Sequence, residues 1–278
     1  MFCFFDIDGT LVGFGKNELI PSTRRALAEA KENGHQLFIC TGRSLMQIPA
    51  WLKESKLFDG IVASAGAHVI HHDTEIYFHS MASDTVRRSV QFFTENEIPY
   101  MLQGRKYNYI AELFSEKLVG SFSEKLGISP KQAKKMFVNC ILTKNPDCTE
   151  VHTENDVILG MLYEKSPFNH EMMRKIMNPA LHINPSSINK PDPCSGEITQ
   201  ADITKASGIR TVMDYFRVPR EETAAFGDGY NDLEMLQFAG AGVAMGNSPD
   251  DVKAAADLVT DTLEADGLYH AMQKLHLV

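Results

Sequence analysis

The chain has 278 residues, enough for one large domain or two of ordinary size. Hydrophobic residues make up 44% and charged residues 23%, as in an ordinary globular protein, and the formal net charge of −9 argues against a general binder of nucleic acid or anionic membranes. No apolar stretch approaches the roughly 20 residues of a membrane helix, and no signal peptide is expected. Five scattered cysteines without CxxC spacing favour a reducing, cytoplasmic location.

The first predicted element is a buried strand over the apolar run Phe2–Phe5, and Asp6-Ile7-Asp8-Gly9-Thr10 follows at its end. Two carboxylates and a glycine turn at that place are difficult to explain by folding alone. In open α/β sheets, ligands bind at this edge. Two carboxylates held so close repel each other unless a cation or a proton intervenes. A hard divalent cation such as Mg²⁺ is therefore expected here.

Strand and helix signals alternate through the first 70 residues, as in an α/β fold. Thr41-Gly42-Arg43 ends the second predicted strand, and the next segment is expected to be a helix that Pro49 kinks or restarts. The other elements expected here are a helix over 22–34, strands over 36–40 and 61–63, and a hairpin over 68–79.

The middle of the chain differs in character. From about Met81 to about Asn184 it is more polar and richer in lysine, which predicts an inserted α+β domain. The stretch Pro185–Gly196 contains three prolines and is predicted to be a linker. These changes place the predicted core at residues 1–82 and 186–278, and the predicted insertion at residues 83–185.

The α/β pattern then resumes. Residues 202–216 form a predicted helix with one apolar face. A strand over 223–226 ends at Gly227-Asp228-Gly229, and further strands are expected over 242–245 and 258–260.

Three predicted strands thus end in a polar side chain, namely Asp6, Thr41 and Asp228. The ends of parallel strands converge on one edge, and Lys205 near the start of a helix could join them there. Anionic metal ligands, a hydroxyl and a cation together suit a phosphoryl group. Each motif alone has a simpler explanation as a turn, a helix start or a solvated side chain. Their ordered combination favours a phosphoryl-transfer site.

The combination resembles the four motifs of the haloacid-dehalogenase-like (HAD) hydrolases, in the family's order. The residues that carry the resemblance are Asp6-Ile7-Asp8-Gly9-Thr10, Cys40-Thr41-Gly42-Arg43, Lys205 and Gly227-Asp228-Gly229-Tyr230-Asn231-Asp232. The insertion between the second and third motifs is similar to the large cap of the Cof-like branch, and so is Val243–Asn247 after the fourth motif. The resemblance implies a Rossmann-like core with a mostly parallel sheet and an inserted α+β cap.

The resemblance also implies an activity, namely Mg²⁺-dependent hydrolysis of small phosphate esters, often sugar phosphates. By position, Asp6 matches the nucleophile, and Asp8 matches the acid/base and lends its backbone carbonyl to the metal. Asp228 matches a metal ligand, and Asp232 lies in or behind the metal's ligand shell. The positions expected to hold substrate phosphate are Thr41, Gly42, Arg43, Lys205 and Asn231.

One departure from the family pattern is Ala65-Gly66-Ala67, where the family often has Asn-Gly-Ala. Two alternatives to a phosphatase stay open. A phosphomutase would return the phosphoryl group to another hydroxyl, but arginines suited to a second phosphate are few in the insertion. A non-catalytic regulator that binds a phosphometabolite would not need the Asp6/Asp8 pair. No partner beyond a small phosphate ester is indicated, neither nucleic acid nor membrane, and no oligomeric state is predicted.

Overall fold

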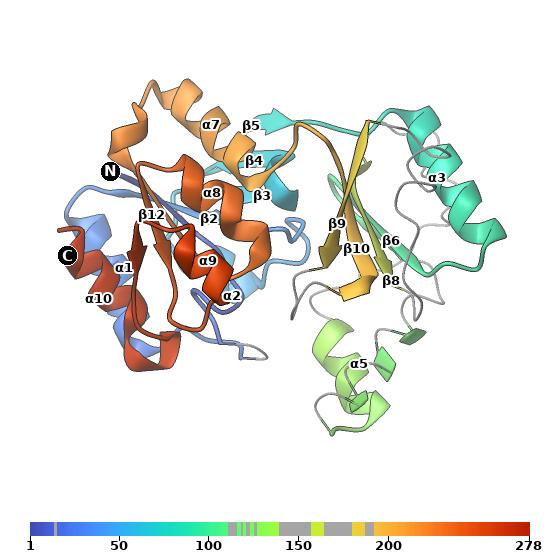
Figure 1. Cartoon of the computed structure of the whole chain (residues 1–278), viewed down its shortest axis with the longest axis horizontal. Coiled ribbons are helices and arrows are strands. Elements are labelled where there is room, and N and C mark those ends of the chain that lie inside the picture. The colour runs from blue at the N-terminus through green and yellow to red at the C-terminus, as the bar shows by residue number, and fades with distance from the viewer. Residues whose placement is uncertain are drawn as a thin grey trace. The chain divides into compact units, whose positions relative to one another are not determined.

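The computed structural model describes residues 1–13, 16–110, 116–117, 119–120, 123–124, 127–138, 157–163, 180–186 and 192–278. The chain divides into two compact units (Figure 1). The main unit comprises Met1–Gly42, Ala50–Phe78 and Ile203–Val278, and the inserted unit comprises Arg43–Pro49 and His79–Asp202. None of the described helices has the length and apolar character needed to cross a membrane.

The main unit contains an eight-stranded sheet in the order β13-β12-β11-β1-β2-β3-β4-β5. The six strands from β13 to β3 are parallel, and β4 and β5 add an antiparallel hairpin at one edge. The mostly parallel α/β fold predicted from the sequence is thereby confirmed. The strands are β1 (Phe2–Phe5), β2 (Gln36–Cys40), β3 (Gly60–Ala63), β4 (His68–His71), β5 (Thr74–Phe78), β11 (Thr223–Gly227), β12 (Ala241–Ala244) and β13 (Leu258–Val259).

Strand β1 is apolar throughout because helices cover both faces of the sheet. Phe4 packs in a cluster with residues of α7 and α8, while Phe5 points to the opposite face and stacks on Phe226 with ring centroids 4.7 Å apart. Figure 1 shows α1 beside α10 and α7 beside α8, and these pairs are in contact. The helices are α1 (Pro21–Glu32), α2 (Ala50–Lys53), α7 (Lys205–Phe216), α8 (Leu233–Phe238), α9 (Asp250–Ala254) and α10 (Gly267–Lys274).

The inserted unit is built on a five-stranded antiparallel sheet in the order β7-β6-β8-β10-β9. Helix α3 buries Val86 and Phe93 in a cluster with Tyr100 and Leu102 of β6. An α+β character was expected for this region and is observed. Its elements are α3 (Ser83–Glu95), β6 (Tyr100–Gly104), β7 (Asn108–Ile110), α5 (Pro130–Val138), β8 (Val157–Tyr163), β9 (Leu181–Ser186) and β10 (Asp192–Gln200).

The predicted linker over Pro185–Gly196 is wrong, because most of it belongs to strands. Strand β10 pairs with both β8 and β9, so the inserted unit extends to Asp202 rather than ending at residue 185. Pro185 is tolerated because β9 is the edge strand, where a missing backbone N–H leaves no inner partner unsatisfied. The register shift between Asp192 and Gly196 marks the irregular start of β10.

The helix expected directly after Arg43 is also wrong, because residues 43–49 form turns and the helix α2 begins only at Ala50. The Ser44 backbone N–H donates to Gln47 Oε1 at 2.9 Å, and the Gln47 N–H donates to the Ser44 carbonyl at 2.9 Å. These local bonds take the place of a helical ladder. Pro49 then precedes the first residue of α2, as expected for a residue that restarts a helix.

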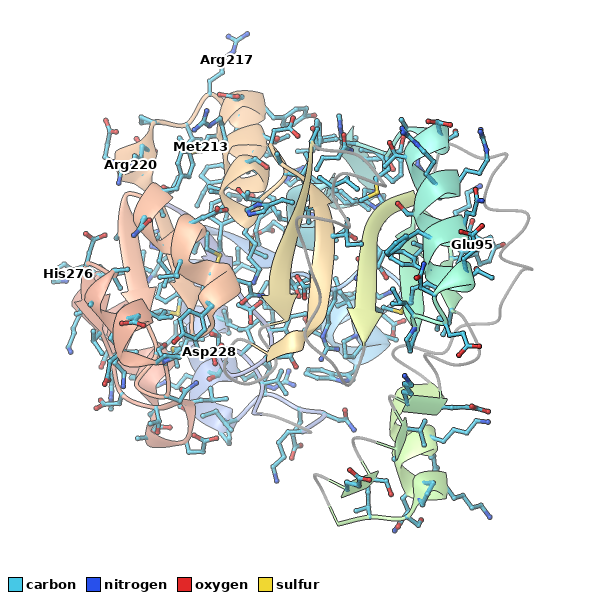
Figure 2. The ribbon with its side chains drawn as sticks, turned by 45° about the vertical axis from the view of Figure 1, so that its right-hand side comes forward. Glu95, Met213, Arg217, Arg220, Asp228 and His276 are labelled. Carbon is cyan, nitrogen blue, oxygen red and sulfur yellow. The ribbon has the colours of Figure 1, made fainter. Side chains whose placement is uncertain are left out.

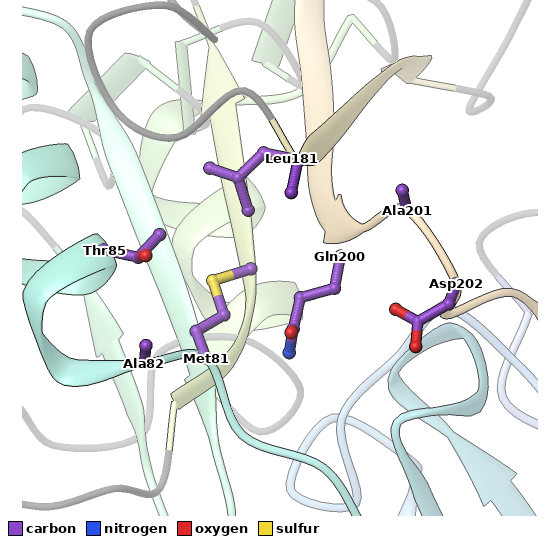
Figure 3. A pocket seen from close by; sticks show the side chains of 8 residues that line it. Met81, Ala82, Thr85, Leu181, Gln200, Ala201 and Asp202 are labelled. Carbon is purple, nitrogen blue, oxygen red and sulfur yellow. The ribbon is translucent and has the colours of Figure 1, made fainter.

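Two segments of the inserted unit, His79–Ala82 and Gln200–Asp202, adjoin its boundaries with the main unit. Gln200 joins them, since its Oε1 lies 3.0 Å from His79 Nε2 and its Nε2 donates to the Ser80 carbonyl at 3.1 Å. A pocket of about 220 Å³ lies against both segments, and Figure 3 shows Met81 and Gln200 in its lining. The remaining lining residues are Ala82, Thr85, Ala180, Leu181, Ala201 and Asp202.

Helix α7 approaches the main sheet very closely through two glycines. A Cβ on Gly208 would overlap Val62 and the Gly66 backbone, and a Cβ on Gly66 would overlap the Thr204 carbonyl. Thr204 caps the helix, because its side chain accepts from the Ser207 N–H and the Ser207 hydroxyl accepts from the Thr204 N–H. The cap and the close approach together fix the start of α7 and hence the position of its first residue, Lys205.

We expect Gly208→Ala to destabilise the main unit by about 1–3 kcal/mol, because the added methyl has to displace β3 or the backbone at Gly66. An unhindered Gly→Ala change inside a helix stabilises by roughly 1 kcal/mol, so the expected sign is the reverse of the usual one. Thermal unfolding measures the effect. Gly13→Ala is the control, since a Cβ there meets only ordinary contact distances. An unchanged or higher melting temperature for Gly208→Ala would contradict the packing described.

Candidate active site

The site begins where two adjacent parallel strands end. Asp6 follows β1, Asp228 follows β11, and the two strands pair in register with Phe5 opposite Phe226. The Asp6 N–H donates to the Phe226 carbonyl at 3.0 Å, which fixes the backbone at the start of the loop. Figure 2 labels Asp228 in the main unit. The expected convergence of these carboxylates at one sheet edge is observed.

Lys205 is a buried cation that bonds to Asp6 and to a third carboxylate, Asp232. Its Nζ donates to Asp6 Oδ1 and to Asp232 Oδ1, each at 2.6 Å, and its side chain is 1% exposed. Burial on its own would lower the pKa of Lys205, but Asp232 and Asp6 outweigh it and the pKa lies well above its usual value. The ammonium group is therefore charged at neutral pH.

Asp232 is fully buried, and both of its carboxylate oxygens accept hydrogen bonds. Oδ1 accepts from Lys205, and Oδ2 accepts from the backbone N–H groups of Asp228 and Gly229, both at 2.9 Å. A Cβ on Gly227 would overlap the Asp232 side chain, so the glycine leaves room for this carboxylate. Asp232 thus shapes the loop after β11 and anchors Lys205.

Asp228 is held by residues that the sequence analysis did not assign to the site. Thr10 Oγ1 donates to its Oδ1 at 3.3 Å, and Asn247 Nδ2 donates to its Oδ2 at 3.0 Å. Asn247 Nδ2 also donates to the Gly9 carbonyl at 3.1 Å. Gly9 has a φ of +86°, and a Cβ there would overlap the Asp228 carboxylate. The signals for Thr10 and Asn247 lay inside stretches already noted, at Asp6–Thr10 and Val243–Asn247.

The carboxylates of this site resist ionisation in the absence of a metal. Burial, with the neighbouring Asp232 and Asp8 charges, raises the pKa of Asp6 to about 7 although Lys205 opposes the shift. Burial, with Asp6 and Asp232, raises the pKa of Asp228 to about 8. Each shift follows from anions placed close together in a medium that solvates them poorly. One lysine does not neutralise three carboxylates.

Asp6, Asp228 and Asp232 form a group whose ligand oxygens all lie within 4.8 Å of one another. Oxygen donors carrying excess negative charge are the donor set that Mg²⁺ prefers. The carboxylates that resist ionisation therefore fit a divalent cation. The Asp8 side chain is not a member of this group.

The structure also places the remaining predicted residues. Thr41 is buried at the end of β2, where its N–H donates to the Val62 carbonyl and its carbonyl accepts from the Ala65 N–H. Asp8 lies half-buried in the loop after β1 and forms an isolated bridge with Val12. Asn231 is exposed in the 3₁₀ turn that ends at Asp232.

Gly42 and Arg43 lie on either side of the boundary between the two units, with Gly42 in the main unit and Arg43 in the inserted unit.

Ala65, the departure from the family pattern, has a φ of +53° and a ψ of 28°. This left-handed conformation suits asparagine better than alanine, because the asparagine side chain can bond locally. Ala65 therefore keeps the backbone shape at the cost of some strain.

Cys40 precedes Thr41 and is buried, so it belongs to the core as its place in an apolar strand predicts. Burial raises the pKa of its thiol above the usual range, which makes it a poor nucleophile.

Comparison with known proteins supports a single family. The model of the haloacid dehalogenase-like hydrolases matches residues 3–272. The 5-amino-6-(5-phospho-D-ribitylamino)uracil phosphatase YitU of Bacillus subtilis is 29% identical over 268 residues, which cover 95% of this chain and 93% of YitU.

Solved structures agree over the full length. The HAD subclass IIB sugar phosphatase BT4131 superposes with a TM-score of 0.81 at 28% identity, covering 100% of this chain and 99% of that one. The phosphatase BT1666 of Bacteroides thetaiotaomicron superposes with a TM-score of 0.78 at 26% identity, covering 100% and 95%. The resemblance read from the motifs is confirmed, including an inserted region like the subclass IIB cap. The chain belongs to the haloacid dehalogenase-like hydrolases and is a phosphatase of that family.

Proposed function

We propose that this phosphatase hydrolyses a small phosphate monoester, of the sugar phosphate class, with Mg²⁺ and through an aspartyl-phosphate on Asp6. The observation that carries the proposal is the position of Asp6 beside Lys205, in one group with Asp228 and Asp232. A carboxylate at a strand end, held by a buried cation and surrounded by metal-binding oxygens, is suited to attack phosphorus.

In the first step, an oxygen of the ionised Asp6 carboxylate attacks phosphorus as the bond from phosphorus to the ester oxygen breaks. The Asp8 carboxyl group gives its proton to the leaving alkoxide. The hydrogen bond from Lys205 leaves one Asp6 oxygen engaged and orients the other for attack.

In the second step, a water molecule attacks the phosphorus of the aspartyl-phosphate. Asp8, now a carboxylate, takes the proton from that water, and the bond between Asp6 and phosphorus breaks. Inorganic phosphate leaves, and both side chains return to their starting states. The same residue serves as acid and then as base because the two steps run in opposite directions.

Asp6, Asp228 and the Asp8 backbone carbonyl would hold Mg²⁺, with Asp232 behind them because its oxygens already bond to Lys205 and to two amides. The cation would offset the repulsion between the phosphate dianion and the attacking carboxylate. Thr41, Gly42, Arg43, Lys205 and Asn231 are the residues proposed to hold the phosphate oxygens, where negative charge spreads in the transition state.

We expect Asp6→Asn to abolish phosphate release from p-nitrophenyl phosphate, by at least about a thousandfold, since an amide cannot form the acyl phosphate. Phosphate release in excess Mg²⁺ measures the loss. Asp59→Asn is the matched control, because Asp59 is a buried carboxylate bonded to Lys31 at 2.7 Å and lies outside the site. Full activity of Asp6→Asn would refute the mechanism.

The raised pKa values predict a pH-dependent stability in EDTA. Between about pH 4 and pH 8 the folded protein keeps protons on Asp6 and Asp228 that the unfolded chain has released, so these groups lower stability as pH rises. As the pH is raised from 5 to 8, we expect the melting temperature of Asp228→Asn to fall less than that of the unsubstituted protein. Saturating Mg²⁺ at pH 8 is expected to raise the melting temperature of the unsubstituted protein by roughly 5–10 °C.

The same Mg²⁺ addition should change the melting temperature of Asp228→Asn little. Equal shifts in both proteins would show that the ion does not bind at this group.

The reaction class is tested by following both products from a panel of sugar phosphates. Hydrolysis predicts inorganic phosphate and free sugar in equal amounts, because water is the second nucleophile. An isomerised sugar phosphate without phosphate release would identify a phosphomutase instead. Tight binding across the panel without turnover would identify a regulator.

A further inference from the structure

The chain crosses between the two units at four places rather than two. Besides the boundaries at Phe78/His79 and Asp202/Ile203, it leaves the main unit after Gly42 and returns at Ala50. The intervening segment Arg43–Pro49, here called the strap, follows the proposed phosphate-holding residues Thr41 and Gly42. The strap packs with the inserted unit, although by sequence it lies between two elements of the main unit, β2 and α2.

Buried polar contacts hold the strap on the sheet of the inserted unit. Ser44 Oγ donates to Asn108 Oδ1 at 2.9 Å, and both residues are 0% exposed. Gln47 is 5% exposed, accepts from the Ser44 N–H through Oε1, and directs its Nε2 to Met101 Sδ at 4.0 Å. Asn108 begins β7 and Met101 lies in β6, so the strap contacts two adjacent strands.

These contacts divide residues that the sequence presents as one phosphate-holding group. Arg43 is bonded within the strap, since its Nη1 donates to the Gln47 carbonyl at 3.2 Å. Thr41 is fixed to the main unit instead, by backbone hydrogen bonds of 2.9 Å to Val62 and 3.0 Å from Ala65. The joint between the two anchored parts falls at Gly42, the residue type with the greatest backbone freedom.

The Ser44–Asn108 pair packs the strap less favourably than an apolar pair would. Asn108 Nδ2 is buried and has no hydrogen-bond partner among the residues that the structure describes. A buried donor that lacks a hydrogen bond destabilises a fold, whereas replacing both partners of a bond by apolar groups of similar shape is nearly neutral. Stability alone therefore does not explain a polar pair at this place. A directional bond does hold one arrangement of the strap against others.

We propose that Asn108 is a positioning residue which, through Ser44, places the Arg43 guanidinium for the anionic group of the substrate. Arginine loses much rotamer freedom when it binds an anion, and anchoring its backbone beforehand reduces that loss. The contribution of Arg43 to binding then depends on the inserted unit holding the strap. The proposal rests on the proposed function, since it takes the substrate to be a phosphate ester.

The first test is a double-mutant cycle between Arg43 and Asn108. Arg43→Ala, Asn108→Ala and Ser44→Ala are each expected to weaken orthophosphate binding, measured by calorimetry in Mg²⁺, by about tenfold, the loss of one charge-assisted bond. KM for p-nitrophenyl phosphate should rise in parallel. The double variant Arg43→Ala/Asn108→Ala should bind no more weakly than Arg43→Ala, because both changes remove one interaction.

The matched control is Ser89→Ala, which removes a buried serine hydroxyl of the same unit that donates to the Thr85 carbonyl at 2.8 Å. It is expected to lower stability without changing orthophosphate affinity. Effects of Arg43→Ala and Asn108→Ala that multiply in the double variant would overturn the proposal. So would unchanged orthophosphate affinity in Ser44→Ala.

A second test needs no catalytic activity. In the full-length protein, Asn108→Ala is expected to speed backbone hydrogen exchange at residues 44–48 at least about tenfold, since the strap loses its anchor, while Ser89→Ala leaves this segment unchanged. Unchanged exchange in Asn108→Ala would overturn the proposal. Absence of turnover by the unsubstituted enzyme would instead refute the proposed function. The exchange and binding results would still test whether Asn108 positions Arg43.

Discussion

The structure depends on one buried ammonium group held between two carboxylates. Lys205 reaches Asp6 and Asp232 at 2.6 Å with almost no exposure to water. A buried ion cluster survives only when geometry and further hydrogen bonds repay the loss of hydration. Here the Thr204 cap and the close approach of Gly208 to Gly66 fix the lysine, and two backbone amides satisfy Asp232. Without this cation the three carboxylates would repel one another unopposed.

The charge balance of the cluster connects folding to function. Three carboxylates face one lysine, so the site lacks positive charge and Asp6 and Asp228 hold protons up to near-neutral pH. Full neutralisation would suit packing but would leave nothing to attract a divalent cation. The incomplete balance keeps Asp6, the proposed nucleophile, close to ionisation and leaves a net negative charge that would attract a divalent cation. Thr10 and Asn247 orient Asp228 without adding charge, which preserves that imbalance.

The sequence predicted the parts of this arrangement that follow from strand ends. Apolar runs identified β1, β2 and β11, and parallel pairing then brought Asp6 and Asp228 together. Thr10 and Asn247 escaped assignment because neutral side chains at turns have many ordinary uses, and only their contacts with Asp228 single them out. The start of β10 was mistaken for part of a linker because Pro193 and Gly196 are signals of turns, and pairing with β8 and β9 outweighs that local preference. The strap could not be predicted, since its contacts join residues more than fifty positions apart.

The pairing of β1 with β11 also determines when the site can assemble during synthesis of the chain. Phe2 lies opposite Thr223, so during synthesis β1 leaves the ribosome 221 residues ahead of the strand with which it pairs. At roughly 5–20 residues per second this delay is about ten to forty seconds. During that time the apolar run of β1 lacks one neighbour, and Asp6 has neither Lys205 nor Asp228 beside it. The group formed by Asp6, Asp228 and Asp232 can therefore assemble only after β11 and the loop that follows it have been synthesised.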